Sequence, residues 1–438
     1  RDVERSRGLG DVYKRQHYLF PCEKEVMADV EVEVDPDEVG IDPERIERLG
    51  THLAKYVDDG RLPGVNVLVS RGGKVAYRYM YGSRDLERDL PVESDTIYRF
   101  YSMTKPITSI AAMQLYEKGL LQLKDPISNW IPGFSDSKVF VGGDAVNPET
   151  RDATREITVH DLLTHTSGLT YHFHMANAVD EMYRRAGFDW TRSPGDLENQ
   201  CNVLASLPLL FDPGTEWNYS YSTDVLGRVV EVVSGLTLDA YMEENIFQPL
   251  GMADTGFSVP EGQESRFASC YFPQGENKQA DLLDDAQRSP YLRKPIGLSG
   301  GGGLVSTLAD YHRFTQALRN NGVLGEQRIV GRKTLQFMTR NHLPGGVDLT
   351  EYGRPLFSET TYDGVGFGLG FSVVVDPTKA KVLSQEGEYG WGGAASTAFW
   401  VDPVEDMTVI FLTQLLPSST HPIRPEMKAL IYLSLIHI

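Results

Sequence analysis

Strand-like segments near both ends of this 438-residue chain, with mostly helical patterns between them, constrain its fold more than any other feature. Residues 65–69 and 75–79 are rich in β-branched and aromatic side chains and flank Gly72-Gly73, which predicts two strands joined by a turn. A second strand-rich zone lies near the other end, at residues 368–375, 396–401 and 407–412. The simplest architecture is an α/β (α+β) layer completed by both ends of the chain, with a helical region inserted in the middle.

Helical spacing of apolar residues is the second pattern. The predicted helices cover residues 42–56, 102–118, 159–163, 224–234 and 238–245. We expect residues 1–26 to be a non-native or disordered leader, residues 27–118 and 286–438 to form the two parts of the α/β domain, and residues 119–285 to form the mainly helical insertion.

Two short segments resemble translated sequencing-adaptor read-through of metagenomic assemblies: residues 11–16, DVYKRQ, and residues 434–438, SLIHI. We therefore expect a native start near Met27 and leave both segments out of the functional argument.

The charge balance excludes several classes of partner. With 42 Lys and Arg against 61 Asp and Glu, the net charge is −19. Such an acidic surface repels phosphate backbones and anionic membranes, so we expect neither a nucleic-acid nor a membrane partner. Cys22, Cys201 and Cys270 are too few for a disulfide framework or a metal cluster. Since no run of about 18 apolar residues occurs, we expect a cytoplasmic protein; secretion stays an alternative if the native N-terminus is missing.

The segment Ser102-Met103-Thr104-Lys105 opens a predicted helix whose body is almost wholly apolar, which indicates a buried helix. Residues three apart share one helix face, so the Lys105 amine can reach the Ser102 hydroxyl. Burial disfavours the ammonium form and lowers the pKa of Lys105, which would let the amine accept the serine proton near neutral pH. The helix N-terminus adds a partial positive charge and a free N–H where an oxyanion would form. The alternative is an N-cap serine beside an exposed lysine.

Two other segments fit short catalytic motifs. Ser135-Asp136-Ser137-Lys138 has the same spacing, but it follows a polar turn in which its lysine would stay solvated and protonated. Residues 297–301 match G-x-S-x-G, a nucleophile elbow that needs a strand before the serine and a helix after it. Lys294-Pro295 interrupts a strand before Ser299, and four consecutive glycines are a poor start for a helix after it. We therefore interpret the segment around Ser299 as a glycine-rich loop.

Several further segments resemble the serine β-lactamase-like superfamily, and most closely the family VIII carboxylesterases, which are similar to class C β-lactamases. These segments are residues 158–168 (TVHDLLTHTSG), 213–220 (PGTEWNYS), 224–227 (DVLG) and 390–393 (GWGG). The resemblance covers roughly residues 42–432 and implies a β-lactamase/transpeptidase-like fold, with an antiparallel sheet flanked by helices. It also implies a catalytic triad of Ser102, Lys105 and Tyr219. An adjacent lysine would lower the pKa of Tyr219, so that phenolate acts as base and phenol protonates the leaving group.

Two departures from the β-lactamases bear on the substrate. Tyr221 stands where those enzymes carry an asparagine two residues after the tyrosine. Trp391-Gly392-Gly393 replaces their Lys-Thr-Gly, so an apolar ring stands where an ammonium would attract the carboxylate of a β-lactam. The resemblance therefore implies substrate contacts from Tyr221, Trp391, Gly392 and Gly393, and an oxyanion hole made by the N–H groups of Ser102 and Ala394. The alternative for Trp391 is a core tryptophan on a strand.

The histidines do not form a recognisable metal site, because no acidic or cysteine partner stands at ligand spacing; they are His160, His165, His172 and His174. We expect no metal and no cofactor. Residues 171–188 either line the pocket or form a solvated loop.

The sequence thus predicts a serine hydrolase that cleaves short-chain carboxylic esters. One alternative is a β-lactamase or D-amino-acid peptidase of the same fold; the other is a non-catalytic penicillin-recognising-like binding protein in which Ser102 is only a helix cap. An acidic exterior around an apolar site favours neutral esters over anionic β-lactams. The expected partner is a small ester molecule, and the sequence predicts no oligomeric state.

Overall fold

The computed structural model describes residues 30–189 and 193–436. The predicted leader at residues 1–26 and the predicted start at Met27 lie outside the described residues. Within the described ranges, no helix is both long enough and apolar enough to cross a bilayer.

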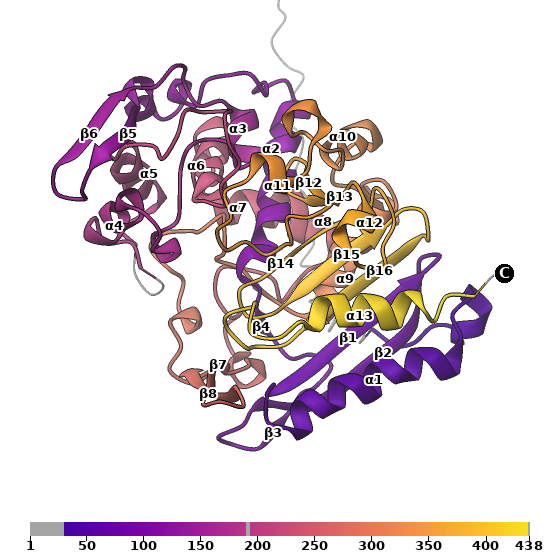
Figure 1. The fold of residues 1–438 in the computed structure, drawn as a ribbon. Helices are drawn as coiled ribbons and strands as arrows, with labels where there is room; N and C mark the ends of the chain where they lie inside the picture. Colours follow the sequence, from indigo (N-terminus) through magenta and orange to yellow (C-terminus); the bar gives the residue numbers. More distant parts are fainter. Residues whose placement is uncertain (1–29, 190–192, 437–438) are drawn as a thin grey trace, which may run out of the picture.

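An eight-stranded antiparallel sheet, drawn from both ends of the chain, lies at the centre of the fold (Figure 1). In spatial order its strands are β12 (Val365–Phe367), β13 (Ser372–Val374), β14 (Tyr389–Gly392), β15 (Ala398–Asp402), β16 (Met407–Leu412), β1 (Gly64–Arg71), β2 (Lys74–Asp85) and β3 (Leu90–Pro91). β1 pairs with β16, and Leu68 lies opposite Ile410, so the two ends of the chain meet inside the sheet. The predicted sheet built from both chain ends is confirmed.

Helices cover both faces of this sheet. Val67 and Val69 of β1 pack in one core with α1 (Pro43–Asp58) and α13 (Ile423–Tyr432), which lie side by side in Figure 1. Leu68, which points to the other face of the pleated strand, belongs to the larger core that contains α2 (Thr104–Glu117) and α9 (Leu308–Arg319).

The region between the sheet segments is mainly helical, as predicted. Its helices, with those near the C-terminal strands, are α3 (Val159–Leu163), α4 (Ala178–Arg185), α5 (Leu197–Ala205), α6 (Ser222–Ser234), α7 (Leu238–Met242), α8 (Gln248–Leu250), α10 (Arg332–Met338), α11 (Leu349–Tyr352) and α12 (Pro377–Ala380). α7 continues as a π-helical turn at Glu243–Phe247. Four two-stranded sheets also occur among the described residues. Three are hairpins: β5 (Lys138–Gly143) with β6 (Pro148–Asp152), β7 (Cys270–Gln274) with β8 (Gln279–Asp284), and β10 (Val323–Leu324) with β11 (Gln327–Arg328). The fourth pairs β4 (Tyr98–Arg99) with β9 (Val305–Ser306), which lies far along the chain.

Two strand predictions are wrong in part. Residues 368–375 do not form one strand, because the chain turns between β12 and β13, where Gly370 has a φ of +90° and donates its N–H to the Leu163 carbonyl at 3.0 Å. The strand predicted from residue 396 begins only at Ala398, since Ser396 has a φ of +67° in the turn that follows β14. The predicted glycine turn between β1 and β2 is confirmed.

Candidate active site

Ser102 lies in a single turn of 3-10 helix, η2 (Tyr101–Met103), directly before α2. The sequence predicted that Ser102 itself opens the helix, but α2 begins at Thr104, with Met103 as its N-cap residue. No side chain caps α2, so the interpretation of Ser102 as a helix cap is wrong. Tyr101 has a φ of +43°, a strained value for a residue with a Cβ, and such strain is concentrated at functional sites.

Lys105 lies one helical turn beyond Ser102, as the spacing predicted. Its Nζ is 3.3 Å from the Ser102 Oγ and donates to the Gly301 carbonyl at 2.6 Å. The side chain is buried, because α2 is enclosed on all sides by the larger core. Burial lowers the pKa of Lys105 to about 8, although the negative charges of Asp224 and Glu359 oppose this shift.

The glycine-rich loop at residues 297–303 supports the lysine and is not a nucleophile elbow. The described segment has neither a strand leading into Ser299 nor a helix starting after it. Ser299 Oγ donates to the Asp224 carboxylate at 2.5 Å, and the Gly301 N–H donates to the same oxygen at 3.1 Å. A Cβ on Gly301 would lie 2.4 Å from that carboxylate, so this contact requires glycine. Sequence reasoning named Asp224 only as part of the segment 224–227 that carries the family resemblance, and it gave this carboxylate no role in the site. The four adjacent glycines were a signal of such a close approach.

The second Ser-x-x-Lys tetrad lies on the surface, as predicted. Ser135 is exposed, and the Lys138 ammonium donates to Asp136 at 2.9 Å and to Asp152 at 2.7 Å. These carboxylates raise the pKa of Lys138, so this lysine stays protonated.

Tyr219 is buried beside Ser102 and Lys105. Lys105 Nζ lies 4.5 Å from the centre of its ring. Burial raises the pKa of Tyr219 well above 10 and the charge of Glu359 adds to this, while the nearby Ser102 and Trp391 side chains lower it only partly. The prediction that lysine lowers this pKa is wrong, because the Lys105 ammonium faces the ring and does not compensate for the loss of water around the hydroxyl. Tyr219 is therefore a phenol at neutral pH, and its hydroxyl has no hydrogen-bond partner among the described residues.

Aromatic side chains surround the pair of Ser102 and Lys105. The Tyr171 ring centre lies 5.4 Å from Lys105 Nζ and 4.6 Å from the ring centre of Tyr221. The Tyr221 hydroxyl lies 2.6 Å from His172 Nδ1. At the start of residues 171–188, Tyr171 thus lines the site, whereas Met175 is 71% exposed in a solvated part of the segment.

Trp391 reaches the same site from β14. Its ring centre lies 5.5 Å from that of Tyr219, and its indole N–H has no partner among the described residues. Trp391 is 3% exposed, so it belongs to the core and also contacts the site. Trp391 and Gly392 also line a cavity of about 430 Å³ next to α13, although Ser102 does not line it.

The two predicted oxyanion-hole donors lie near each other in the fold. A Cβ on Gly393 would lie 2.3 Å from the Phe100 carbonyl oxygen, so the end of β14 lies against the segment that leads to Ser102. The backbone N–H groups of Ser102 and Ala394 donate to no carbonyl in the described ranges. The role of these two N–H groups as oxyanion-hole donors stays a prediction.

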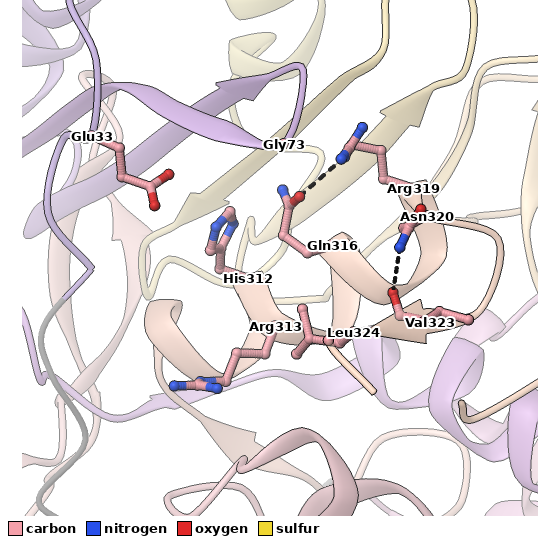
Figure 2. Close-up of a pocket in the computed structure, with 10 residues that line it drawn as sticks. Glu33, Gly73, His312, Arg313, Gln316, Arg319, Asn320, Val323 and Leu324 are labelled. Carbon is pink, nitrogen blue, oxygen red and sulfur yellow. Dashed lines mark hydrogen bonds between the residues drawn. The ribbon is translucent and has the colours of Figure 1, made fainter. Parts of the chain in front are cut away.

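Figure 2 shows a different hollow of about 320 Å³, between α9 and the β1–β2 turn. His312 and Gln316 of α9 project into this region together with Glu33. The described residues that line this hollow include none of the candidate site residues.

The central sheet and the buried Ser-x-x-Lys tetrad define a β-lactamase/transpeptidase-like fold. The chain belongs to the Beta-lactamase family, whose model matches residues 49–432. Protein Rv1367c of Mycobacterium tuberculosis (strain ATCC 25618 / H37Rv) is 35% identical over 371 residues, which are 83% of this chain and 89% of that protein. Esterase EstB of Burkholderia gladioli is 31% identical over 403 residues, covering 87% of this chain and 93% of EstB. The structure of EstCE1, named as a hydrolase with promiscuous acyltransferase activity, matches with a TM-score of 0.72 at 27% identity and covers 91% of this chain and 99% of EstCE1. The resemblance and the fold class predicted from the sequence are confirmed.

Proposed function

We propose that this chain is a serine hydrolase that cleaves short-chain carboxylic esters through an acyl-enzyme on Ser102. The observation that carries the proposal is the buried pair of Ser102 and Lys105, in which hydroxyl and amine lie 3.3 Å apart. Because the pKa of Lys105 is lowered to about 8, about a tenth of this lysine is neutral at pH 7 and able to accept a proton.

In the acylation step, Ser102 Oγ attacks the ester carbonyl carbon and its proton moves to neutral Lys105. The carbonyl oxygen becomes an oxyanion, which the N–H groups of Ser102 and Ala394 stabilise. The Gly301 carbonyl accepts a hydrogen bond from Lys105 in this arrangement and keeps the amine directed toward the serine.

Tyr219 supplies the proton for the leaving alcohol. Its raised pKa keeps the hydroxyl protonated, and its position beside Ser102 brings that proton close to the bond that breaks. The ammonium of Lys105 then returns a proton to Tyr219. In the second half of the reaction, water attacks the acyl-enzyme carbonyl carbon and gives a proton to Lys105. The tetrahedral intermediate then expels the Ser102 oxygen, which takes this proton back from Lys105, so that the carboxylic acid leaves and the Ser102 hydroxyl and neutral Lys105 are restored.

The side chains around the site support an ester substrate. Trp391 offers an apolar surface beside Tyr219, at the position where β-lactamases carry a lysine that would attract the carboxylate of a β-lactam. Tyr221 adds a second aromatic side chain next to the site. Gly392 and Gly393 allow substrate and backbone to approach closely. The names of EstB, an esterase, and of EstCE1, a hydrolase, agree with this substrate class.

The second candidate is a β-lactamase or D-amino-acid peptidase, and the matching family model favours it. Both reactions use the same acyl-enzyme, so only relative rates separate them. We expect kcat/KM for p-nitrophenyl butyrate to exceed that for nitrocefin on one preparation; the reverse order would favour the second candidate.

Ser102→Ala tests the nucleophile. It should abolish p-nitrophenyl butyrate hydrolysis and labelling by a fluorophosphonate probe while circular dichroism stays unchanged. Ser135→Ala, in the exposed second tetrad, is the matched control and should retain full activity. Retained activity in Ser102→Ala contradicts the proposal, and failure of the folded, unsubstituted protein to label at Ser102 favours the non-catalytic alternative.

A cytoplasmic location also belongs to the proposal. Cys201 and Cys270 are both free and buried, which fits a reducing compartment, whereas Cys22 lies outside the described residues.

A further inference from the structure

Arg424, near the start of α13, binds the strand end that carries one of the two oxyanion-hole donors. Its Nη2 donates to the carbonyl oxygens of Gly393, at 3.2 Å, and Thr397, at 2.7 Å. Its Nη1 donates to the Glu359 carbonyl at 2.6 Å, and the fully buried Glu359 carboxylate accepts from Nη2 at 2.9 Å. Ser418 donates to the same carboxylate oxygen at 2.8 Å.

This arginine approaches β14 from the face opposite the site. Successive strand residues point to opposite faces, and the Trp391 ring lies beside Tyr219. The next residue, Gly392, faces α13, because a Cβ there would lie 2.3 Å from Arg424 Nη2. Arg424 therefore contacts the backbone of this segment through the space that glycine leaves open.

The Gly393–Ala394 peptide connects this contact to the oxyanion hole. In a planar trans peptide the C=O and the following N–H point in opposite directions. Arg424 holds the Gly393 carbonyl from the side of α13, so the Ala394 N–H points away from α13. The Phe100 carbonyl lies against Gly393, where a Cβ would be 2.3 Å from its oxygen. The Ala394 N–H donates to no backbone carbonyl among the described residues.

We infer that Arg424 is a positioning residue that orients the Gly393–Ala394 peptide and thereby aims the Ala394 N–H at the substrate oxyanion. A cation bound to the carbonyl also polarises the amide and strengthens its N–H as a donor. Lysine cannot replace this arginine, because only the planar guanidinium supplies several donors in a fixed geometry. Glu359 fixes the guanidinium in turn.

This inference rests on the proposed ester hydrolysis through Ser102, and Arg424→Lys tests it with the positive charge kept. We expect kcat for p-nitrophenyl butyrate to fall about 10- to 100-fold with KM changed less than about threefold, because misorientation weakens a donor that acts mainly in the transition state. A boronic acid, whose adduct with Ser102 places an oxygen in the same hole, should bind more weakly by a similar factor. The pH at which activity falls on the acid side should not move.

Lys428→Met is the matched control. Lys428 lies one turn further along α13 and pairs with Glu388, and it has no hydrogen bond to the 393–397 segment. Both its kcat and its boronic acid affinity should stay within about twofold of those of the unsubstituted protein.

Glu359→Gln keeps the proposal testable if Arg424→Lys does not fold. It should reduce kcat and boronic acid affinity in the same direction, and it should also move the acid limb to lower pH, because the Glu359 charge raises the pKa of Lys105. A folded Arg424→Lys or Glu359→Gln protein with unchanged kcat, or a loss of kcat without loss of boronic acid affinity, overturns the inference. An unsubstituted protein that neither hydrolyses the ester nor labels at Ser102 instead refutes the proposed function.

Discussion

Asp224 and Lys105 both bind the backbone of Gly301. The Gly301 N–H donates to the Asp224 carboxylate at 3.1 Å, and the Gly301 carbonyl accepts a hydrogen bond from Lys105 Nζ at 2.6 Å. One glycine thus holds two opposite charges in the interior of the protein. Asp224 lies at the start of α6 and Lys105 at the start of α2, so the packing of these two helices sets the environment of the lysine. The charge of Asp224 raises the pKa of Lys105, while burial lowers it to about 8.

Ester hydrolysis should increase with pH through an apparent pKa of about 8, because only neutral Lys105 accepts the Ser102 proton. Below that value, kcat/KM should fall about tenfold for each pH unit as the ammonium form accumulates. A pH-stat assay, which does not depend on the ionisation of a chromophore, measures this profile. An acid limb near pH 4, as for a free carboxylate, would contradict the assignment of Lys105 as base.

Asp224→Asn should move this acid limb to lower pH. The amide still offers an oxygen to Gly301 or Ser299, but the negative charge that favours the ammonium form of Lys105 is lost. Activity at pH 6, expressed relative to the plateau, should therefore increase. Asp310→Asn is the control. Asp310 is also buried, with its pKa raised to about 6, but it accepts a hydrogen bond from Thr255 and is not one of the charges that shift the pKa of Lys105, so the acid limb should stay in place.

Tyr219→Phe should separate activity from stability. Loss of the proton donor should reduce kcat by about 10² to 10⁴. The buried hydroxyl has no partner, so its removal should leave the free energy of unfolding unchanged or raise it by about 1 kcal/mol. In Tyr311→Phe, by contrast, a buried hydroxyl that donates to the Met103 carbonyl at 3.0 Å is lost, and urea denaturation should show a decrease of about 1 kcal/mol. An equal loss of stability in both variants would show that Tyr219 has a mainly structural role.

The sequence predicted the sheet because strand patterns were plain at both ends, and β1 and β16 indeed pair there. It missed the β5–β6 hairpin, since every residue of Pro148–Asp152 is exposed and the strand has no alternation of apolar and polar side chains. Strand ends at residues 368–371 and 396 were missed because backbone turns there depend on contacts with distant parts of the chain.

For the candidate site, local spacing was sufficient for Ser102 and Lys105, which lie within one turn of each other. It was not sufficient for Asp224 or Arg424, which contact the site from segments far along the chain. The pKa of Tyr219 was predicted in the wrong direction because a motif gives a neighbour but not the degree of burial, which dominates the shift.

Gly393→Ala tests whether the end of β14 must approach the Ser102 segment closely. A Cβ at this position would lie 2.3 Å from the Phe100 carbonyl oxygen, and backbone atoms cannot move aside as a flexible side chain can. The Gly393–Ala394 peptide must therefore shift, which should weaken the Ala394 donor and reduce kcat by about 10²-fold, the usual cost of losing one oxyanion-hole hydrogen bond. Gly256→Ala is the matched control, because the contact of its Cβ, 3.6 Å from the Ser258 carbonyl oxygen, is an ordinary one. Steady-state kinetics with p-nitrophenyl butyrate, alongside circular dichroism, should show the loss in Gly393→Ala alone; equal kcat in the two folded variants would exclude the oxyanion-hole geometry proposed for Ala394.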